Sequence, residues 1–169
     1  MKTLNSSVAV LLVSGLVNLA FAVEYPDPVD RVIESSNGKY LLKVDADTHI
    51  HEICEVLPDG KGKQKVLWSF KRDVWHNAYV LSNDGKRVLW IAHPNFHVRR
   101  EEFSAMIYTA DGVVWKRTVF QLSNPQPSRK AGVKSTWRKG VTTEGARTTI
   151  QVLGNPPLVI DMNNPPLNS

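Results

Sequence analysis

The stretch Ser82-Asn83-Asp84-Gly85-Lys86-Arg87-Val88-Leu89 decides the fold, because a near copy stands about 47 residues earlier as Ser35-Ser36-Asn37-Gly38-Lys39-Tyr40-Leu41-Leu42. Asn-Gly and Asp-Gly pairs tolerate the positive φ that tight turns between antiparallel strands require. Each copy is followed by a second glycine turn, at Asp59-Gly60 and at Asp111-Gly112. A period of this length predicts a repeat architecture.

The segments between these turns have the pattern of β-strands. Tyr40, Leu42 and Val44 alternate with neighbours on the other face, which is the period of a strand. The run 88–92 is apolar throughout and the run 103–108 nearly so, which predicts strands covered on both faces. We expect strands at 29–35, 39–45, 50–57 and 64–71 in the first unit, and at 76–82, 86–92, 103–109 and 113–121 in the second. Trp68 and Trp90 are expected in the core, as is the single cysteine, Cys54.

Four antiparallel strands in about 45–50 residues resemble a blade of a β-propeller. The Ser82–Leu89 turn is similar to the Ser-x-Asp-Gly-(Lys/Arg) turn of WD-like blades, and the resemblance covers roughly residues 29–121. Two units are too few to close a ring, for which at least ~4 blades are needed. We therefore predict an all-β fold of two four-stranded antiparallel blade-like units, packed as a sandwich or partial propeller, plus a C-terminal strand or two. Assembly of several chains into a ring is the alternative.

The first 22 residues have the pattern of a cleaved signal peptide. Lys2 precedes an apolar core at 8–17, and Ala20-Phe21-Ala22 is a small-x-small cleavage site. A retained membrane anchor is the alternative; otherwise no transmembrane segment is expected. After cleavage we expect two blade-like repeats at 23–122, a basic flexible loop or linker at 123–140, further strands of the same domain at 141–162, and a disordered tail at 163–169. The protein is expected to be exported, either periplasmic or secreted.

Potential metal ligands alternate along one short segment. Asp45, Asp47, His49 and His51 would share one face of an extended chain. The matching loop of the second unit carries His93 and His97. Imidazole and carboxylate together suit zinc or copper, so convergence of the two loops would give a metal site. The alternative is that Asp-Ala-Asp-Thr forms an ordinary turn and leaves these residues as solvated loop positions.

The segment between Val113 and Thr143 contains seven cations and no acidic residue. Such a segment can contact an anionic partner, and an aromatic residue among cations can stack on a ligand. The candidate contacts are Arg129, Lys130, Lys134, Trp137, Arg138 and Lys139. The alternative is a solvated loop in which Trp137 packs back onto the domain. Because export argues against nucleic acid, the expected partner is an envelope protein or an anionic polymer.

No catalytic residues are predicted, because the sequence has no Gly-x-Ser-x-Gly elbow, no glycine-rich phosphate loop and no His-Glu-x-x-His motif. The sequence favours an exported, non-enzymatic β-domain that binds a partner at the cell envelope through its loops. Two alternatives remain: a periplasmic metal-binding protein that uses the loop histidines, and a hydrolase of unknown type.

Overall fold

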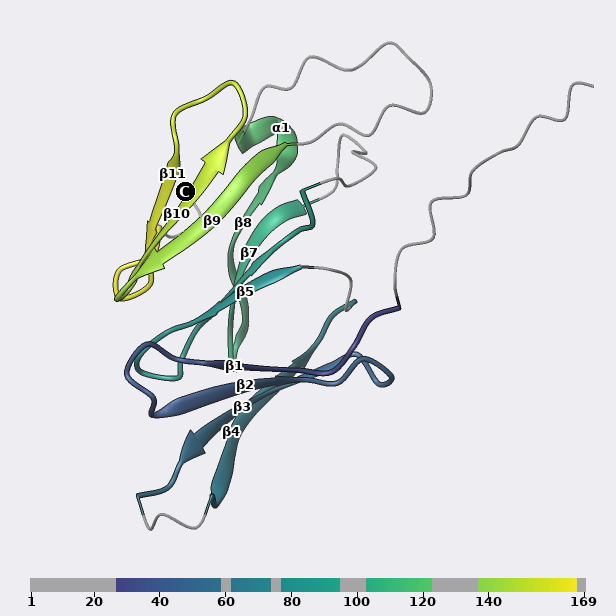
Figure 1. The fold of residues 1–169 in the computed structure, drawn as a ribbon, viewed down its shortest axis with the longest axis vertical. Helices are drawn as coiled ribbons and strands as arrows, with labels where there is room; N and C mark the ends of the chain where they lie inside the picture. Colours follow the sequence, from purple (N-terminus) through teal and green to yellow (C-terminus); the bar gives the residue numbers. More distant parts are fainter. Residues whose placement is uncertain (1–26, 59–61, 74–76, 95–102, 123–136, 167–169) are drawn as a thin grey trace, which may run out of the picture.

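The computed structural model describes residues 27–58, 62–73, 77–94, 103–122 and 137–166. In these residues eleven strands form three antiparallel sheets, and there is one short helix (Figure 1). Each sheet is a simple meander in which consecutive strands pair. The first sheet contains β1 (Arg31–Glu34), β2 (Tyr40–Val44), β3 (Ile50–Val56) and β4 (Gln64–Lys71). The second contains β5 (Ala78–Leu81), β6 (Val88–Ile91), β7 (Phe103–Thr109) and β8 (Gly112–Thr118), and the helix α1 (Val119–Leu122) follows it. The third contains β9 (Arg138–Glu144), β10 (Arg147–Val152) and β11 (Leu158–Asp161).

The predicted fold class is confirmed, since both units form four-stranded antiparallel sheets. The strands lie near the expected places, except that the end of the expected strand 113–121 belongs to the helix α1. The C-terminal part has three strands where one or two were expected. The additional strand, β9, begins at Arg138, inside the segment 123–140 that was expected to be a linker. This strand was not predicted because basic residues stand at its start. It pairs with β10 through a tight hairpin, in which Glu144 and Arg147 are opposite each other and Gly145 has φ 59°. Of the expected tail, Asn163 and Asn164 donate backbone hydrogen bonds to Asp161, and 167–169 lie outside the described residues.

The repeated sequence motif forms a hydrogen-bonded turn. In the first sheet the Ser35 hydroxyl donates to the Asn37 side-chain oxygen at 2.9 Å and accepts the backbone N–H of Tyr40 at 3.0 Å. The same Asn37 oxygen accepts the backbone N–H of Lys39 at 3.1 Å. The serine hydroxyl and the Asn37 side-chain oxygen thereby accept hydrogen bonds from two backbone N–H groups of the turn.

The second copy of the motif repeats these three hydrogen bonds, although the Ser35 hydroxyl also lies 3.1 Å from the Tyr40 carbonyl. The Ser82 hydroxyl donates to Asp84 Oδ1 at 2.6 Å, and the backbone N–H groups of Lys86 and Arg87 bind Asp84 and Ser82 at 3.0 and 2.9 Å. Gly85 has φ 67°, and a side chain there would overlap the ring of Tyr40 from the first sheet. The repeat in the sequence is therefore a repeat of turn chemistry, with one glycine also required for packing between the sheets.

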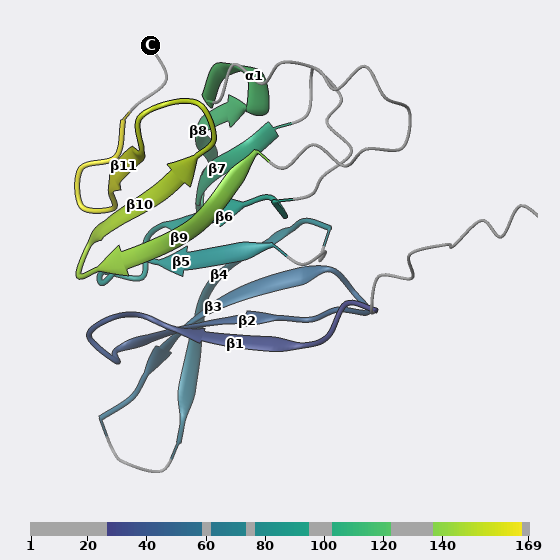
Figure 2. The same cartoon turned by 45° about the horizontal axis from the view of Figure 1, so that its top comes forward.

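The second sheet is the middle layer of a three-layer stack (Figure 2). All of β6 is buried, as is β7 from Ser104 to Tyr108, which confirms the prediction of strands covered on both faces. The first sheet covers one face, where Phe70 stacks on Tyr108 with ring centroids 4.2 Å apart. The third sheet covers the other, where Arg87 Nη1 donates to the Met162 carbonyl at 3.1 Å.

The turns that follow the first strand of each sheet meet at one end of the stack. Asn37 donates two hydrogen bonds to Asn83, from its side-chain amide to the Asn83 carbonyl at 2.8 Å and from its backbone N–H to Asn83 Oδ1 at 3.1 Å. The Ser36 hydroxyl donates to the Gly145 carbonyl at 3.1 Å. β1, β5 and β9 therefore all end on the same side of the molecule.

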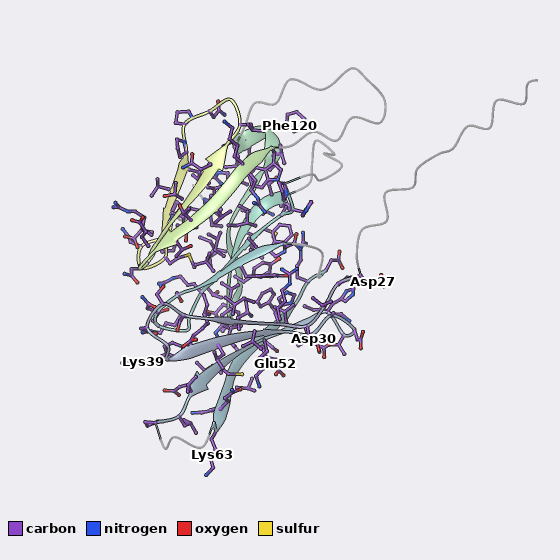
Figure 3. The ribbon with its side chains drawn as sticks, viewed as in Figure 1. Asp27, Asp30, Lys39, Glu52, Lys63 and Phe120 are labelled. Atoms are coloured by element: carbon purple, nitrogen blue, oxygen red, sulfur yellow. The ribbon has the colours of Figure 1, made fainter. Side chains whose placement is uncertain are left out.

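One hydrophobic cluster runs through all three sheets. Trp90 and Cys54 are buried, as predicted, and Trp68 is partly buried against the cluster. Lys63 and Phe120 mark opposite ends of the stack, beside the β3–β4 hairpin and at α1 (Figure 3). Within the described ranges, no helix is long and apolar enough to span a bilayer.

Candidate functional site

The segment that carries the alternating metal-ligand pattern folds as a tight turn. Asp45 Oδ1 accepts the backbone N–H groups of Asp47 and Thr48 at 3.0 and 2.8 Å, and the backbone N–H of His49 donates to the Asp45 carbonyl. The hydrogen bonds from Thr48, followed by the one from Asp47, hold the pKa of Asp45 below its usual value. His49 has φ 62°, which breaks the extended geometry. The single ligand-bearing face does not form because the segment is a turn, although His51 is buried and is not a solvated loop residue.

His51 and His49 occupy different environments. His51 is fully buried, with Nε2 3.0 Å from the Tyr79 hydroxyl and its ring stacked on Phe70 at 4.6 Å. Burial lowers the pKa of His51 to about 4, so its imidazole is neutral at pH 7. His49 has a side chain 41% exposed and places Nδ1 3.5 Å from Asp73 Oδ1.

The second histidine loop is only partly described. The backbone N–H of His93 donates to Asn77 Oδ1 at 3.2 Å, and its carbonyl accepts the Trp137 indole N–H at 3.0 Å. His97 lies outside the described residues. Across the parts of the chain that the structure describes, no three or more His, Cys, Asp or Glu side chains lie close enough to hold a metal ion.

Two of the predicted anion contacts are core residues. Trp137 is fully buried and Arg138 is 8% exposed, with Arg138 Nε donating to the Ala92 carbonyl at 3.0 Å. Burial lowers the pKa of Arg138. Their assignment as surface contacts is therefore wrong, and the alternative, that Trp137 packs back onto the domain, is confirmed. Lys139 is exposed, whereas Arg129, Lys130 and Lys134 lie outside the described residues.

A groove of about 450 Å³ opens between the outer parts of the first and second sheets. One side is β4, the other is β8, and the two turns of the second sheet close one end. The lining residues are Leu67, Trp68, Asp84, Gly85, Lys86, Arg87, Thr109, Ala110, Asp111 and Val114. Sequence analysis identified both turns but not the hollow between them.

The floor of the groove is apolar and held in place by the turn. The Trp68 indole N–H donates to the Gly85 carbonyl at 2.8 Å, which fixes the ring against the second sheet. Leu67 is the extra residue of a β-bulge opposite Ile53, and its side chain is 39% exposed. The bulge therefore places an apolar side chain at the mouth of the groove, beside Val114.

The charged groups of the rim are not equivalent. Burial alone would raise the pKa of Asp84, but hydrogen bonds from Ser82 and Lys86, together with the charge of Arg87, lower it. Arg87 Nη1 lies 3.1 Å from Asp84 Oδ2, so these two charges compensate each other. Lys86 and Asp111 are exposed and form no ion pair within the described part of the chain. The rim thus offers one cation and one carboxylate to a ligand, from two different turns.

Sequence reasoning missed this site for a physical reason. The turns have a local signature, but the depth of the groove depends on how the first sheet packs on the second and on the bulge at Leu67. Leu67 lies in the alternating strand 64–71, and an apolar residue at that position does not by itself indicate a bulge or a groove.

Comparison of the chain with protein families and with curated proteins gave no match.

Proposed function

We propose that this chain is an exported, non-enzymatic β-domain that binds a partner at the cell envelope, and that the groove between β4 and β8 is the contact site. The observation that carries the proposal is the groove itself: about 450 Å³, with an apolar floor and exposed charges at its rim. Ligand sites generally have volumes of ~300–1,000 Å³ and combine apolar walls with a few placed polar groups.

The groove is also preorganised. Trp68 is tied to Gly85, and the turn that carries Gly85 is held by the Ser82–Asp84 network. Side chains that are fixed before binding lose little conformational entropy when a partner arrives. This favours a binding surface over an incidental hollow between two sheets.

Export is supported by the sequence of the first 22 residues, where a cation precedes a short apolar core and a small-x-small site. The repeat architecture supports binding through loops and turns, since rigid β-scaffolds present variable connections as contact surfaces.

Site-specific photo-crosslinking tests the proposal. A benzoylphenylalanine at Leu67 is expected to form adducts in intact cells that survive envelope fractionation. The matched control is the same group at Val159, which is 51% exposed on the third sheet. Equal adduct patterns at both positions, or none at Leu67, would contradict a partner site in the groove.

A further inference from the structure

We propose that the groove receives an extended acidic peptide, which adds to the free edge of β4 as a fifth strand of the first sheet. The inference rests on the proposed function and names the chemistry of the partner. β4 is suited to this role because it is the last strand in the order β1-β2-β3-β4 and, at eight residues, the longest strand. Within the described residues, no strand pairs with its outer edge.

The register of the β3–β4 pair identifies the backbone groups that face outward. The Arg72 N–H donates to the His49 carbonyl, so alternate positions toward the bulge, Phe70 and Trp68, also direct their backbone groups at β3. Ser69 and Lys71 lie between them and direct their backbone N–H and C=O groups away from β3. These are the groups that an incoming strand would pair with, as in peptide recognition by strand addition.

The packing of the two sheets leaves room for that strand. β4 lies over β7, where Phe70 stacks on Tyr108 with an interplanar angle of 13°. β8 pairs with β7 and so lies about 4.8 Å farther out, the spacing of neighbouring strands. Val114 of β8 lines the groove together with Leu67 and Trp68 of β4. A strand added beside β4 would lie over β8 and place every second side chain in the groove.

Charge selects an acidic partner. Lys65 and Lys71 are exposed on β4, Lys86 on the turn, and Lys116 on β8. None of these lysines forms an ion pair within the described ranges. Among the lining residues the carboxylate left uncompensated is that of Asp111, because Asp84 is paired with Arg87. A peptide that alternates apolar and acidic residues would bury the apolar side chains and bring its carboxylates to these lysines.

The competing interpretation is that the lysines protect an exposed edge from pairing, which is how many β-proteins avoid aggregation. The two interpretations predict opposite results with a defined peptide. The probe is a capped, fluorescein-labelled hexapeptide of alternating glutamate and valine, titrated with the mature chain and followed by anisotropy. Saturable binding that weakens with added salt is expected, since the lysines are exposed. Absence of binding would overturn the inference.

Two control peptides separate strand addition from simple charge attraction. N-methylation of alternate residues removes the N–H groups that would face β4, with the charges kept, and should weaken binding by about tenfold or more. Replacing glutamate by lysine should abolish binding. If the N-methylated peptide binds as well as the parent, the strand-addition geometry is wrong.

Protein variants locate the site. Lys86→Glu and Lys116→Glu should each weaken binding several-fold, whereas Lys139→Glu, an exposed change on the third sheet, should not. An equal loss in Lys139→Glu would assign the binding to nonspecific charge and overturn the inference. Crosslinking at Leu67 without hexapeptide binding would refute the acidic strand and leave the proposed function standing. Failure of both would refute both.

Discussion

His51 makes the stability of the protein dependent on pH between about pH 6.5 and pH 4. The imidazole is fully buried between the first and second sheets, stacked on Phe70 and 3.0 Å from the Tyr79 hydroxyl. Burial, the largest cause, together with the charges of His49 and Arg72, lowers its pKa from 6.5 to about 4, against the opposing hydrogen bond to the His49 carbonyl. Tyr79 is correspondingly kept neutral, since burial raises its pKa to about 12.

The sign of the effect follows from proton binding. The unfolded chain takes up a proton at His51 near pH 6.5, whereas the folded protein does so only near pH 4. Above pH 6.5 both states are neutral at this position and His51 contributes no pH dependence. Between pH 6.5 and 4 the free energy of unfolding falls as the pH is lowered, by up to about 1.4 kcal/mol per pH unit and about 3 kcal/mol in total.

The assay is urea unfolding followed by tryptophan fluorescence at several values between pH 7.5 and pH 4. His51→Gln removes the titration and retains a partner for Tyr79, so its unfolding free energy should lose this dependence although its absolute value is lower. His51→Phe provides a second test if the glutamine variant does not fold. His49→Asn is the matched control and should keep most of the wild-type dependence, because burial, and not the charge of His49, is the largest cause of the lowered pKa of His51. Parallel pH curves for wild type and His51→Gln would refute the reasoning.

Three further changes test the packing of the sheets, each by urea unfolding. Gly85→Ala should destabilise by about 2–4 kcal/mol, because the methyl group meets a ring of the first sheet, whereas Gly145→Ala, with a similar φ and open space around it, should cost about 1 kcal/mol. Trp137→Ala should lower the free energy of unfolding by about 3–5 kcal/mol, because the tryptophan is fully buried. A surface tryptophan would give a much smaller loss. Ser35→Ala and Ser82→Ala should cost similar amounts, about 1–2 kcal/mol each, because they remove equivalent hydrogen bonds; very different losses would contradict the equivalence of the two turns.

The fold could be predicted from the sequence where its causes are local. The turns at Gly38 and Gly85 can be recognised in the sequence by the serine and the Asn or Asp residue that precede each glycine. The neighbouring strands either alternate apolar and polar residues or are apolar on both faces. β9 was missed because Arg138, a charged residue, faces the core and is satisfied there by a backbone carbonyl. That partner lies 46 residues away in the chain, so no local pattern could reveal it.

The candidate site, too, could be predicted only where its causes are local. The metal hypothesis assumed an extended chain, but the Asp45 carboxylate captures two backbone N–H groups and closes a turn. The groove depends on a bulge at Leu67 and on the offset between two sheets. Neither the bulge nor the offset can be predicted from a short stretch of sequence.

Residues 47 positions apart lie on equivalent faces of the first and second sheets. Val44 lies directly opposite the buried His51 and so faces the second sheet, as does Leu42 two residues before it. The equivalent residues are Leu89 and Ile91, which point away from the first sheet and lie under the third. Each sheet therefore packs on its successor with the same face, in a head-to-tail order.

The same comparison explains why the stack can end at the first sheet. On the middle sheet, Leu81 and Trp90 are buried on the face that meets the first sheet, because Trp90 lies directly opposite Tyr79. The equivalent positions on the outward face of the first sheet are Glu34 and Lys43, which are not buried. Charged residues at these two positions are what a terminal repeat needs in order to face water. A ring of several chains that covered this face would bury Val32, which is 65% exposed and pairs with Lys43, but it would also have to bury both charges in a sheet-to-sheet contact.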